Sequence, residues 1–430
     1  MTSAGTTGAP ILKILGFDSW TGGAHHYQRL LGAFRDRGME LTLVHLGSWG
    51  GDVGRPARET LGELRARDIS SYARKGFRDV LRTDNPSAVV FLSTDTFAHR
   101  AFNRYCRAAG IPTLNLFHGL VSVQAVDGGS VYKVNLLSQL AFVGSRIGKA
   151  LRNVWPTYAL SLLRTGATLR EWMRFGQDIV GLTLGRFPVK SAADARTTRC
   201  CVYVSADVPY AVGKYGFAPQ DVTPVGNPDL ARFGLTADLL GAHLGDAAQE
   251  HADVMYVDTG LVFAGRVFSS LGDFVDHLAA TRDALGAQGK RLVFKPHPDH
   301  AKTDSLSRFT EAGIELCSND EFVPRLRDCC ACIAEPSTIT LIPALMGLPV
   351  FLANYGKLQE QRFGDVLTSY PRARLLRDVR DFGALLAEER GQLDVVQARQ
   401  WIGQNAGPLP ADQMPGRVAD VLLQMIRNKA

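Results

Sequence analysis

Short apolar runs alternate along the chain with stretches whose apolar residues recur at helical spacing. A mostly apolar run at residues 11–17 precedes a stretch in which Leu30, Leu31 and Phe34 share one helix face, and a second apolar run covers residues 41–46. The alternation continues through residues 88–117. Because strands that alternate with helices pair side by side in one direction, this pattern predicts a doubly wound α/β domain with a parallel sheet.

The same alternation returns from residue 254, after two stretches that break it. Residues 131–184 lack it and are predicted to form a helical insertion, and residues 235–252 are polar and rich in Ala and Gly, which is typical of a linker. We therefore expect an α/β protein with two Rossmann-like domains that face a central crevice. The predicted boundaries are residues 1–234 for the N-terminal domain, 235–415 for the C-terminal domain and 416–430 for a helix that packs back across the domains.

Composition narrows the class of protein. The chain has 430 residues, a hydrophobic content of 46% and a net charge of +6, as expected of a folded, mildly basic protein that binds an anionic small molecule rather than nucleic acid. Its seven cysteines lack the spacing of a zinc site, and no GxGxxG motif follows a strand, so we expect no metal and no nicotinamide cofactor. No secretory signal and no apolar run of about 18 residues is present, which predicts a cytoplasmic protein.

Two polar clusters follow apolar runs in the predicted C-terminal domain. Lys295 and His297 come after the run at residues 292–294, and the prolines that bracket His297, including Pro298, hold this turn extended. Ser337 and Thr338 follow the run at residues 332–334, where the first N–H groups of the next helix lack partners. The clusters are expected at neighbouring strand ends, where open parallel sheets bind ligands, and predict a phosphate site. Helix capping is the alternative for the two hydroxyls.

Two candidate catalytic groups and a pair of glycines follow three other predicted strands. Asp258 precedes Thr259 and Gly260, and its carboxylate is a candidate general base or nucleophile, with helix capping as the alternative. His118 follows the run at residues 113–117, and its imidazole suits proton removal from an acceptor hydroxyl. Gly22 and Gly23, at the first strand-to-helix turn, would let a ligand or another backbone segment approach closely.

The predicted helical insertion combines basic and aromatic side chains. Such a segment either lies on an acidic membrane surface or packs on the sheet with a solvated basic face. The basic residues are Arg146, Lys149, Arg152, Arg164, Arg170 and Arg174, set among Trp155, Tyr158, Trp172 and Met173.

These motifs resemble those of the GT-B transferases of bacterial surface-polysaccharide assembly. In sialyltransferases, polysialyltransferases, CMP-Kdo transferases and CDP-glycerol glycerophosphotransferases, a His-Pro motif and a downstream Ser-Ser/Thr motif bind the nucleotide phosphate; His297-Pro298 and Ser337-Thr338 resemble them. Asp258-Thr259-Gly260 resembles the acidic-acidic-Gly motif of the sialyltransferase-like families, with Thr259 in place of the second acid. His118-Gly119 resembles the His-Gly of the glycerophosphotransferases.

The resemblance implies a nucleotide-dependent glycosyltransferase that uses no metal. The N-terminal domain would bind the acceptor, a surface glycan or its lipid carrier, and the C-terminal domain the nucleotide-sugar donor, with CMP-linked sugars favoured. Lys295, His297, Ser337 and Thr338 would neutralise the leaving phosphate, Asp258 would act as base or nucleophile with His118 as second choice, and Glu335 would bind the ribose or sugar of the donor. The basic region would contact the cytoplasmic membrane face.

Three alternatives remain open from the sequence. Transfer of glycerol phosphate from CDP-glycerol would assign the base to His118. Epimerases that act on UDP-N-acetylglucosamine have a similar fold but need more acids in the crevice. A non-catalytic protein of this fold would bind a glycan or a membrane partner.

Overall fold

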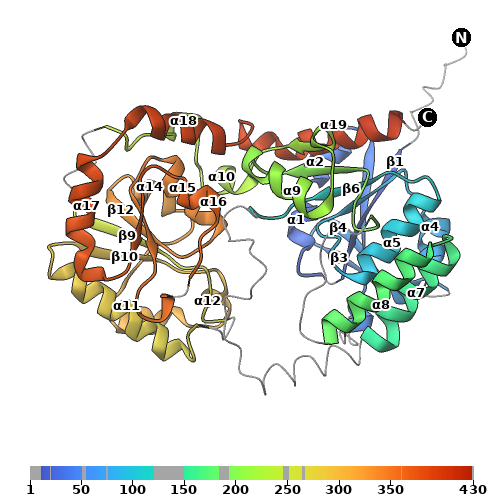
Figure 1. Cartoon of the computed structure of the whole chain (residues 1–430), viewed down its shortest axis with the longest axis horizontal. Helices are drawn as coiled ribbons and strands as arrows, with labels where there is room; N and C mark the ends of the chain where they lie inside the picture. Colours follow the sequence, from blue (N-terminus) through green and yellow to red (C-terminus); the bar gives the residue numbers. More distant parts are fainter. Residues whose placement is uncertain are drawn as a thin grey trace, which may run out of the picture.

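The computed structural model of the 430-residue chain contains two parallel β-sheets, each covered by helices on both faces (Figure 1). This architecture confirms the predicted two-domain α/β fold. The structure describes residues 11–19, 21–50, 55–73, 76–120, 150–183, 193–245, 251–263, 267–359 and 361–428.

The N-terminal sheet has eight strands in the order β3-β4-β2-β1-β5-β6-β7-β8, and only β3 runs antiparallel to its neighbour. The chain order reverses beside β1, which pairs with β2 on one side and β5 on the other. The short hairpin of β3 and β4 has few apolar residues and was not predicted. The strands are β1 (Leu12–Asp18), β2 (Met39–His45), β3 (Arg58–Leu61), β4 (Leu64–Asp68), β5 (Ala88–Phe91), β6 (Thr113–Leu116), β7 (Arg199–Val202) and β8 (Val222–Pro224).

Helices pack on both faces of this sheet. The helix predicted around residue 30 is divided into two short helices, α1 and α2, whose Tyr27, Leu30 and Phe34 are fully buried. The helices are α1 (Ala24–Gln28), α2 (Leu31–Arg35), α3 (Gly47–Gly50), α4 (Phe77–Asp84), α5 (Phe97–Ala108), α7 (Trp155–Arg164), α8 (Leu169–Thr183), α9 (Val208–Tyr215) and α10 (Pro228–Arg232).

The C-terminal sheet has six parallel strands in the order β11-β10-β9-β12-β13-β14. Its central strand, β9, lies between β10 and β12, so the two segments that carry the predicted phosphate-binding clusters flank the segment that carries Asp258. The strands are β9 (Asp253–Val257), β10 (Arg291–Lys295), β11 (Glu315–Leu316), β12 (Cys329–Ala334), β13 (Val350–Ala353) and β14 (Ala373–Leu376).

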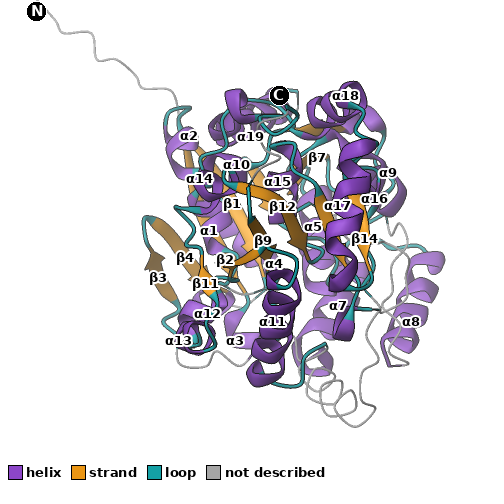
Figure 2. Ribbon diagram, turned by 90° about the vertical axis from the view of Figure 1, so that its left-hand side faces the viewer, coloured by secondary structure: helices purple, strands orange, loops and turns teal. Residues whose placement is uncertain are grey.

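The second sheet is buried between two groups of helices, and α11 and α17 lie in front of it in Figure 2. Phe274 and Leu278 of α11 pack on one face, whereas Leu345 of α15 and Ile402 of α18 pack on the other. The helices are α11 (Leu271–Gly286), α12 (Asp299–Lys302), α13 (Leu306–Glu311), α14 (Phe322–Leu326), α15 (Leu341–Leu345), α16 (Asp365–Thr368), α17 (Phe382–Gly391), α18 (Val395–Asn405) and α19 (Met414–Arg427).

The two sheets share one hydrophobic cluster, which runs from β1 to β9 through the connecting segment. Phe233, just after α10, packs edge-on against Phe322 of α14, with ring centroids 5.6 Å apart. The C-terminal helix α19 lies on the N-terminal domain, where Asp420 accepts a 2.7 Å hydrogen bond from Arg37 (Figure 1). Apolar packing and this return of the chain join the two domains.

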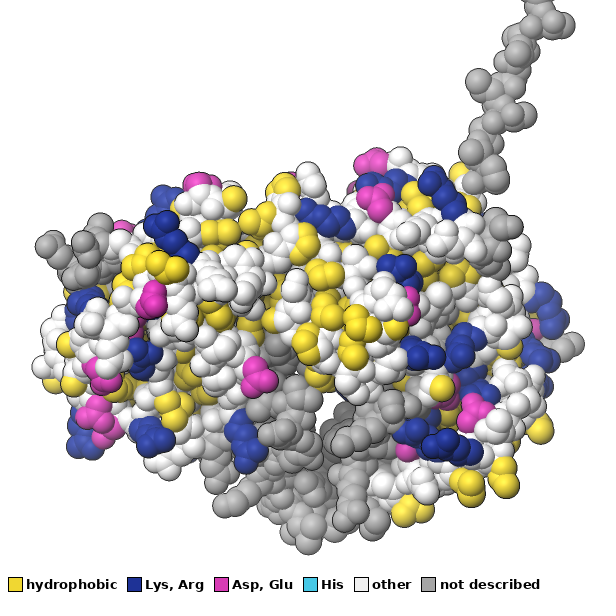
Figure 3. All heavy atoms as spheres, turned by 45° about the horizontal axis from the view of Figure 1, so that its top comes forward, with side chains coloured by type: hydrophobic (Ala, Val, Ile, Leu, Met, Phe, Trp, Pro, Cys, Tyr) yellow, Lys and Arg dark blue, Asp and Glu magenta, His cyan; other side chains and the backbone are white. Residues whose placement is uncertain are grey.

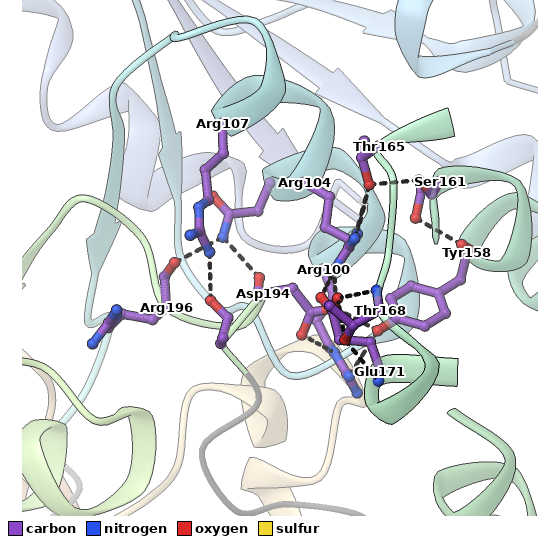
Figure 4. Close-up of polar contacts among 12 residues, drawn as sticks. Arg100, Arg104, Arg107, Tyr158, Ser161, Thr165, Thr168, Glu171, Asp194 and Arg196 are labelled. Atoms are coloured by element: carbon purple, nitrogen blue, oxygen red, sulfur yellow. Dashed lines mark hydrogen bonds and ion pairs between the residues drawn. The ribbon is translucent and has the colours of Figure 1, made fainter. Parts of the chain in front are cut away.

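The described part of the helical insertion, α7 and α8, packs on α5 (Figure 4). Arg100 of α5 donates hydrogen bonds to Asp194 at 3.0 Å, to Asp178 at 2.9 Å and to the Tyr158 hydroxyl at 2.9 Å. Tyr158 is 1% exposed. This buried network fixes the hairpin to the sheet.

Of the two interpretations of the helical insertion, packing on the sheet describes its aromatic residues, which point inward. Trp155, Tyr158 and Trp172 belong to the core beneath the hairpin, because the helical stripe that carries them faces α5. Arg152, Arg164 and Arg170 are exposed, whereas Arg146 and Lys149 lie outside the described residues. Among the helices described, none is both long and apolar enough to cross a membrane.

Candidate active site

Asp258 holds together the loops at the carboxyl ends of β9 and β10. Its carboxylate accepts hydrogen bonds from the Gly260 N–H at 2.7 Å, the His297 N–H at 3.0 Å and the His300 Nε2 at 3.0 Å. The side chain is 1% exposed. Because its oxygens are occupied and buried, the arrangement fits a residue that positions the His297 loop, and it does not support the predicted role of Asp258 as base or nucleophile.

His297 lies against Gly260, and this contact explains why a glycine follows Asp258 and Thr259. A Cβ atom at Gly260 would stand 2.9 Å from the His297 ring, and the glycine has a φ of +77°, which favours residues without a side chain. The His297 side chain is 34% exposed. Burial lowers its pKa from the ordinary value, so the imidazole is neutral at pH 7 and can donate one hydrogen bond to a ligand.

His300 is a buried member of this loop that the sequence analysis did not single out. It is 0% exposed, donates to Asp258, and stacks on Phe274 with ring centroids 5.9 Å apart. Pro298 precedes the single turn of α12, which brings His300 back beneath the loop. The spacing of the two histidines in the sequence, three residues apart after a strand, was the available signal.

Glu335 ends β12 and is fully enclosed. Its carboxylate accepts hydrogen bonds from the Tyr256 hydroxyl at 2.9 Å and from the Thr259 N–H at 3.1 Å and hydroxyl at 2.7 Å. Burial, followed by the negative charge of Asp258, raises the pKa of Glu335 to about 8. With both oxygens occupied at 0% exposure, the geometry does not support the predicted contact with a donor ribose or sugar.

The Thr259 contact gives a physical reason for the departure from the acidic-acidic-Gly motif. Its hydroxyl and N–H both donate to Glu335, whereas an ionised acid at this position would offer no side-chain donor to Glu335. It would also bring an unpaired negative charge into a buried site, which is strongly unfavourable. Thr259 and Glu335 therefore form a matched pair.

Lys295 lies at the junction of the domains rather than in the open part of the His297 loop. The residue is 3% exposed, and its Nζ donates to the Pro296 carbonyl at 3.1 Å. The Nζ also lies 6.0 Å and 5.9 Å from the ring centroids of Phe233 and Phe322. Burial lowers its pKa. Lys295 supplies positive potential here, but direct contact with a phosphate, as predicted, is not supported by this burial.

Ser337 and Thr338 stand where the chain leaves β12, and the α-helix predicted directly after them begins only at Leu341. A 3₁₀ turn covers Thr338–Thr340, and the five-residue helix α15 follows. Pro343 and the bond from the Thr340 hydroxyl to the Glu335 carbonyl, 2.9 Å long, favour this tight turn. Both Ser337 and Thr338 are partly exposed.

The N-terminal domain meets this turn through the segment that follows β6. The Leu120 N–H donates to the Thr338 hydroxyl oxygen at 3.3 Å, and a Cβ at Gly119 would lie 3.7 Å from the same oxygen. The interaction leaves the hydroxyl proton of Thr338 available to a ligand. Candidate residues predicted from distant parts of the sequence therefore come together across the domain boundary.

His118, two residues before this contact, is exposed and held in one orientation. Its Nδ1 donates to the Leu92 carbonyl at 3.0 Å. Since a carbonyl only accepts, Nδ1 carries the proton and Nε2 has a free lone pair. This tautomer is the one that a general base requires.

Two more histidines stand beside His118 and were not singled out from the sequence. The His26 ring centroid lies 5.4 Å from that of His118 and 3.9 Å from that of His25. Both come from α1, next to the glycines at the first strand-to-helix turn. The adjacent pair of histidines after this turn was a usable signal.

The two glycines before α1 have different surroundings. A Cβ at Gly23 would lie 2.6 Å from the Asp18 carboxylate and 3.0 Å from Leu92, so this glycine is explained by close internal packing. Gly22 is exposed, and its carbonyl lies 3.2 Å from the His25 Nδ1. Within the described residues, no group of three or more His, Cys, Asp and Glu side chains is arranged to hold a metal ion.

Comparisons with known proteins support the architecture. No protein-family model matches the chain, and neither does any curated protein sequence. Among solved structures, the calicheamicin glycosyltransferase CalG4 is similar, with 14% identity, 97% of this chain and 98% of that chain covered, and a TM-score of 0.50.

A structure of the wall teichoic acid polymerase TagF is similar as well, with 9% identity, 98% of this chain and 90% of that chain covered, and a TM-score of 0.50. At these identities the likeness concerns the fold alone. The chain has the two-domain GT-B fold.

Proposed function

We propose that the protein is a glycosyltransferase that uses a nucleotide-sugar donor, with CMP-linked sugars favoured, and transfers to a surface glycan or lipid-linked acceptor. The observation that carries this proposal is the hydrogen bond from the Leu120 N–H to the Thr338 hydroxyl, two residues after the oriented His118. Group transfer from a phosphate leaving group requires a base near the phosphate site, and the closeness of these two segments supports the proposal.

The phosphate site would use neutral donors and no metal. The His297 imidazole and the hydroxyls of Ser337 and Thr338 would donate hydrogen bonds to the leaving phosphate, and the buried Lys295 would add positive potential behind them. Donors fixed in place before the reaction stabilise charge that develops on a leaving group. Asp258 would hold the His297 loop.

His118 would remove the proton from the acceptor hydroxyl. Its support is the exposed Nε2 lone pair, in contrast to Asp258, whose carboxylate is enclosed by three hydrogen bonds. The same contrast favours a second candidate function, transfer of glycerol phosphate from CDP-glycerol, because the sequence resemblance assigns the base in that reaction to the His-Gly motif.

Nucleotide binding tests the proposal and separates the two candidates. Thermal unfolding would be measured with CMP, CDP, UDP and GDP at equal concentration, for the wild type and for His297→Ala. A ligand at 100 times its Kd stabilises the folded protein by about 2.7 kcal/mol. Stabilisation by CMP that is lost in the variant supports a CMP-sugar donor, and a preference for CDP supports the glycerol phosphate reaction. A preference for UDP or GDP excludes both donors, and no response to any nucleotide overturns the proposal.

We also propose that the outer face of α7 and α8 contacts an anionic membrane surface on the cytoplasmic side. Leu169, Met173 and Val180 are 75%, 56% and 56% exposed and share one stripe of α8, and Leu163 of α7 is 70% exposed. The exposed Arg164 and Arg170 are next to Leu163 and Leu169 in the sequence. Apolar side chains among dark blue basic ones are visible at the lower right of Figure 3. Such a face inserts shallowly and attracts anionic lipids.

Sedimentation with vesicles tests this contact. The wild type should bind vesicles with 30% phosphatidylglycerol more strongly than vesicles of phosphatidylcholine alone, and Leu169→Ser with Met173→Ser should abolish the difference. Val396→Ser is the matched control, because Val396 is 77% exposed on α18, in the other domain. Equal binding of both vesicle types, or equal loss in the control, would contradict the contact.

A further inference from the structure

A group of basic and imidazole side chains lies on the N-terminal domain beside His118 and outside the phosphate site proposed above. Its members, which we call the basic strip, are His25, His26, Arg29 and Arg232. The rings of His25, His26 and His118 follow one another at centroid distances of 3.9 and 5.4 Å. Arg29 directly follows the last residue of α1, and Arg232 is the last residue of α10.

Several donors of the basic strip lack protein partners. The Nδ1 of His26 and the Nη1 of Arg29 are buried atoms without a hydrogen bond in the described part of the chain. Buried polar atoms in folded proteins are normally paired, so such atoms point to a ligand or to solvent. Burial lowers the pKa of His26 to about 2, so this imidazole is neutral, with one N–H to donate and one nitrogen to accept.

The strip carries more positive than negative charge. Asp229 lies 3.4 Å from Arg29, a long contact, and both side chains are 24% exposed. Among the described residues, no ion pair links Arg232 to a carboxylate, and this side chain is exposed. Among the described residues, the two guanidinium groups of the strip therefore have a single ion pair, that of Arg29 with Asp229.

The strip also continues to the C-terminal domain. The Arg232 guanidinium lies 5.2 Å and the Lys295 Nζ 6.0 Å from the centroid of the same Phe233 ring. Because Arg232 belongs to α10 and Lys295 to β10, these two cations around one aromatic ring extend the positive potential from the N-terminal to the C-terminal domain. The strip therefore borders the junction of the two domains.

We propose that the basic strip binds a phosphate group of the acceptor, so that the acceptor is a phosphorylated molecule, such as a phosphate-linked glycan or lipid. This inference rests on the proposed function, which assigns the phosphate of the donor to Ser337 and Thr338. Guanidinium groups bind phosphate through paired hydrogen bonds, and imidazole N–H groups add single ones. The contact between His26 and His118 places this phosphate near the base, which then faces a hydroxyl close to it along the acceptor.

The test uses the full chain saturated with CMP and two probes that differ only in a phosphate, glycerol 3-phosphate and glycerol. Titration calorimetry should detect binding of glycerol 3-phosphate and none of glycerol. Arg232→Gln should weaken this binding about tenfold, the loss expected for one charge-assisted contact, and leave CMP affinity unchanged. Arg29→Gln should act in the same direction. Arg35→Gln is the matched control, because Arg35 is an exposed arginine of α2 whose side chain is 71% accessible.

The outcomes separate this inference from the proposed function. If glycerol 3-phosphate displaces CMP and its binding is lost in His297→Ala but not in Arg232→Gln, only the donor site binds phosphate and the inference fails. If CMP does not bind while glycerol 3-phosphate binds through Arg232, the strip is a phosphate site and the donor assignment fails. Absence of binding by glycerol 3-phosphate to the wild type overturns the inference.

Discussion

The candidate catalytic residues of the two domains have opposite surroundings. In the C-terminal domain, Asp258 and Glu335 are enclosed and each accepts three hydrogen bonds from the protein. In the described part of the N-terminal domain, His118 is exposed and its Nε2 has no hydrogen bond, and buried atoms of His26 and Arg29 lack partners. Similar positions in two related folds therefore carry different kinds of group.

This difference distinguishes residues that hold the loops of a site in position from residues that can react with a substrate. A buried carboxylate with its hydrogen bonds satisfied stabilises a loop, and its removal leaves unpaired donors. An oriented but unpaired imidazole keeps its capacity for a substrate. By this criterion His118 is the better candidate for base, and Asp258 and Glu335 hold in place the loops that we propose bind phosphate.

The largest effect is expected for His118→Ala. Loss of a general base lowers the rate of transfer by about 10²–10⁴, whereas CMP affinity and thermal stability should change little because the side chain is exposed. Transfer rates and CMP titration would be compared with those of His251→Ala, a histidine before β9. If His118→Ala retained wild-type turnover, His118 would not be the base, and the contrast drawn between His118 and Asp258 would fail.

Glu335 is expected to make the free energy of unfolding depend strongly on pH. Its pKa is raised from the ordinary value of about 4.5 to about 8, so between these values the folded protein holds a proton that the unfolded chain releases. The free energy of unfolding therefore falls as the pH rises through this window, by at most ~1.4 kcal/mol per pH unit for one proton. Glu335→Gln cannot titrate and should lose this component. Urea unfolding at pH 5, 6, 7 and 8 measures it, and identical slopes in both proteins would count against the buried pair with Asp258.

Asp258→Ala is expected to lower the free energy of unfolding by ~3 kcal/mol, because three donors lose their buried acceptor. It should also weaken CMP binding, since the His297 loop is no longer held. Asp299→Ala in the same loop is the control, because its side chain is 38% exposed and its removal should cost below ~1 kcal/mol. A stable Asp258→Ala protein with intact CMP binding and no turnover would instead favour a catalytic carboxylate.

The smallest effect is expected for Gly260→Ala. The added methyl group would meet the His297 ring at a φ of +77°, which together cost ~2 kcal/mol. Gly403→Ala in α18 is the control, because nothing lies within 4 Å of the added atom and a helical alanine stabilises by up to ~1 kcal/mol. Equal unfolding free energies for the two variants would exclude the contact between Gly260 and His297.

The sequence by itself determined the two α/β domains and the strand ends that carry His118, Asp258 and the His297 and Ser337 clusters. These features depend on local rules, namely apolar periodicity and turn residues, which act over a few neighbouring positions. The 3₁₀ turn that precedes the helix after Thr338 was not predicted, because it depends on the buried bond between Thr340 and Glu335.

Only the tertiary structure decided which polar side chains have hydrogen-bond partners within the protein and which remain available to a ligand. Asp258 is bonded to His300, 42 positions away in the sequence. Glu335 is bonded to Tyr256 and Thr259, 79 and 76 positions away. Leu120 contacts Thr338, 218 positions away. Composition and spacing carry no information about such partners, because hydrogen bonding and burial depend on which strands become neighbours. The same holds for the basic strip, whose residues on α1, after α1 and on α10 come together only in the folded N-terminal domain.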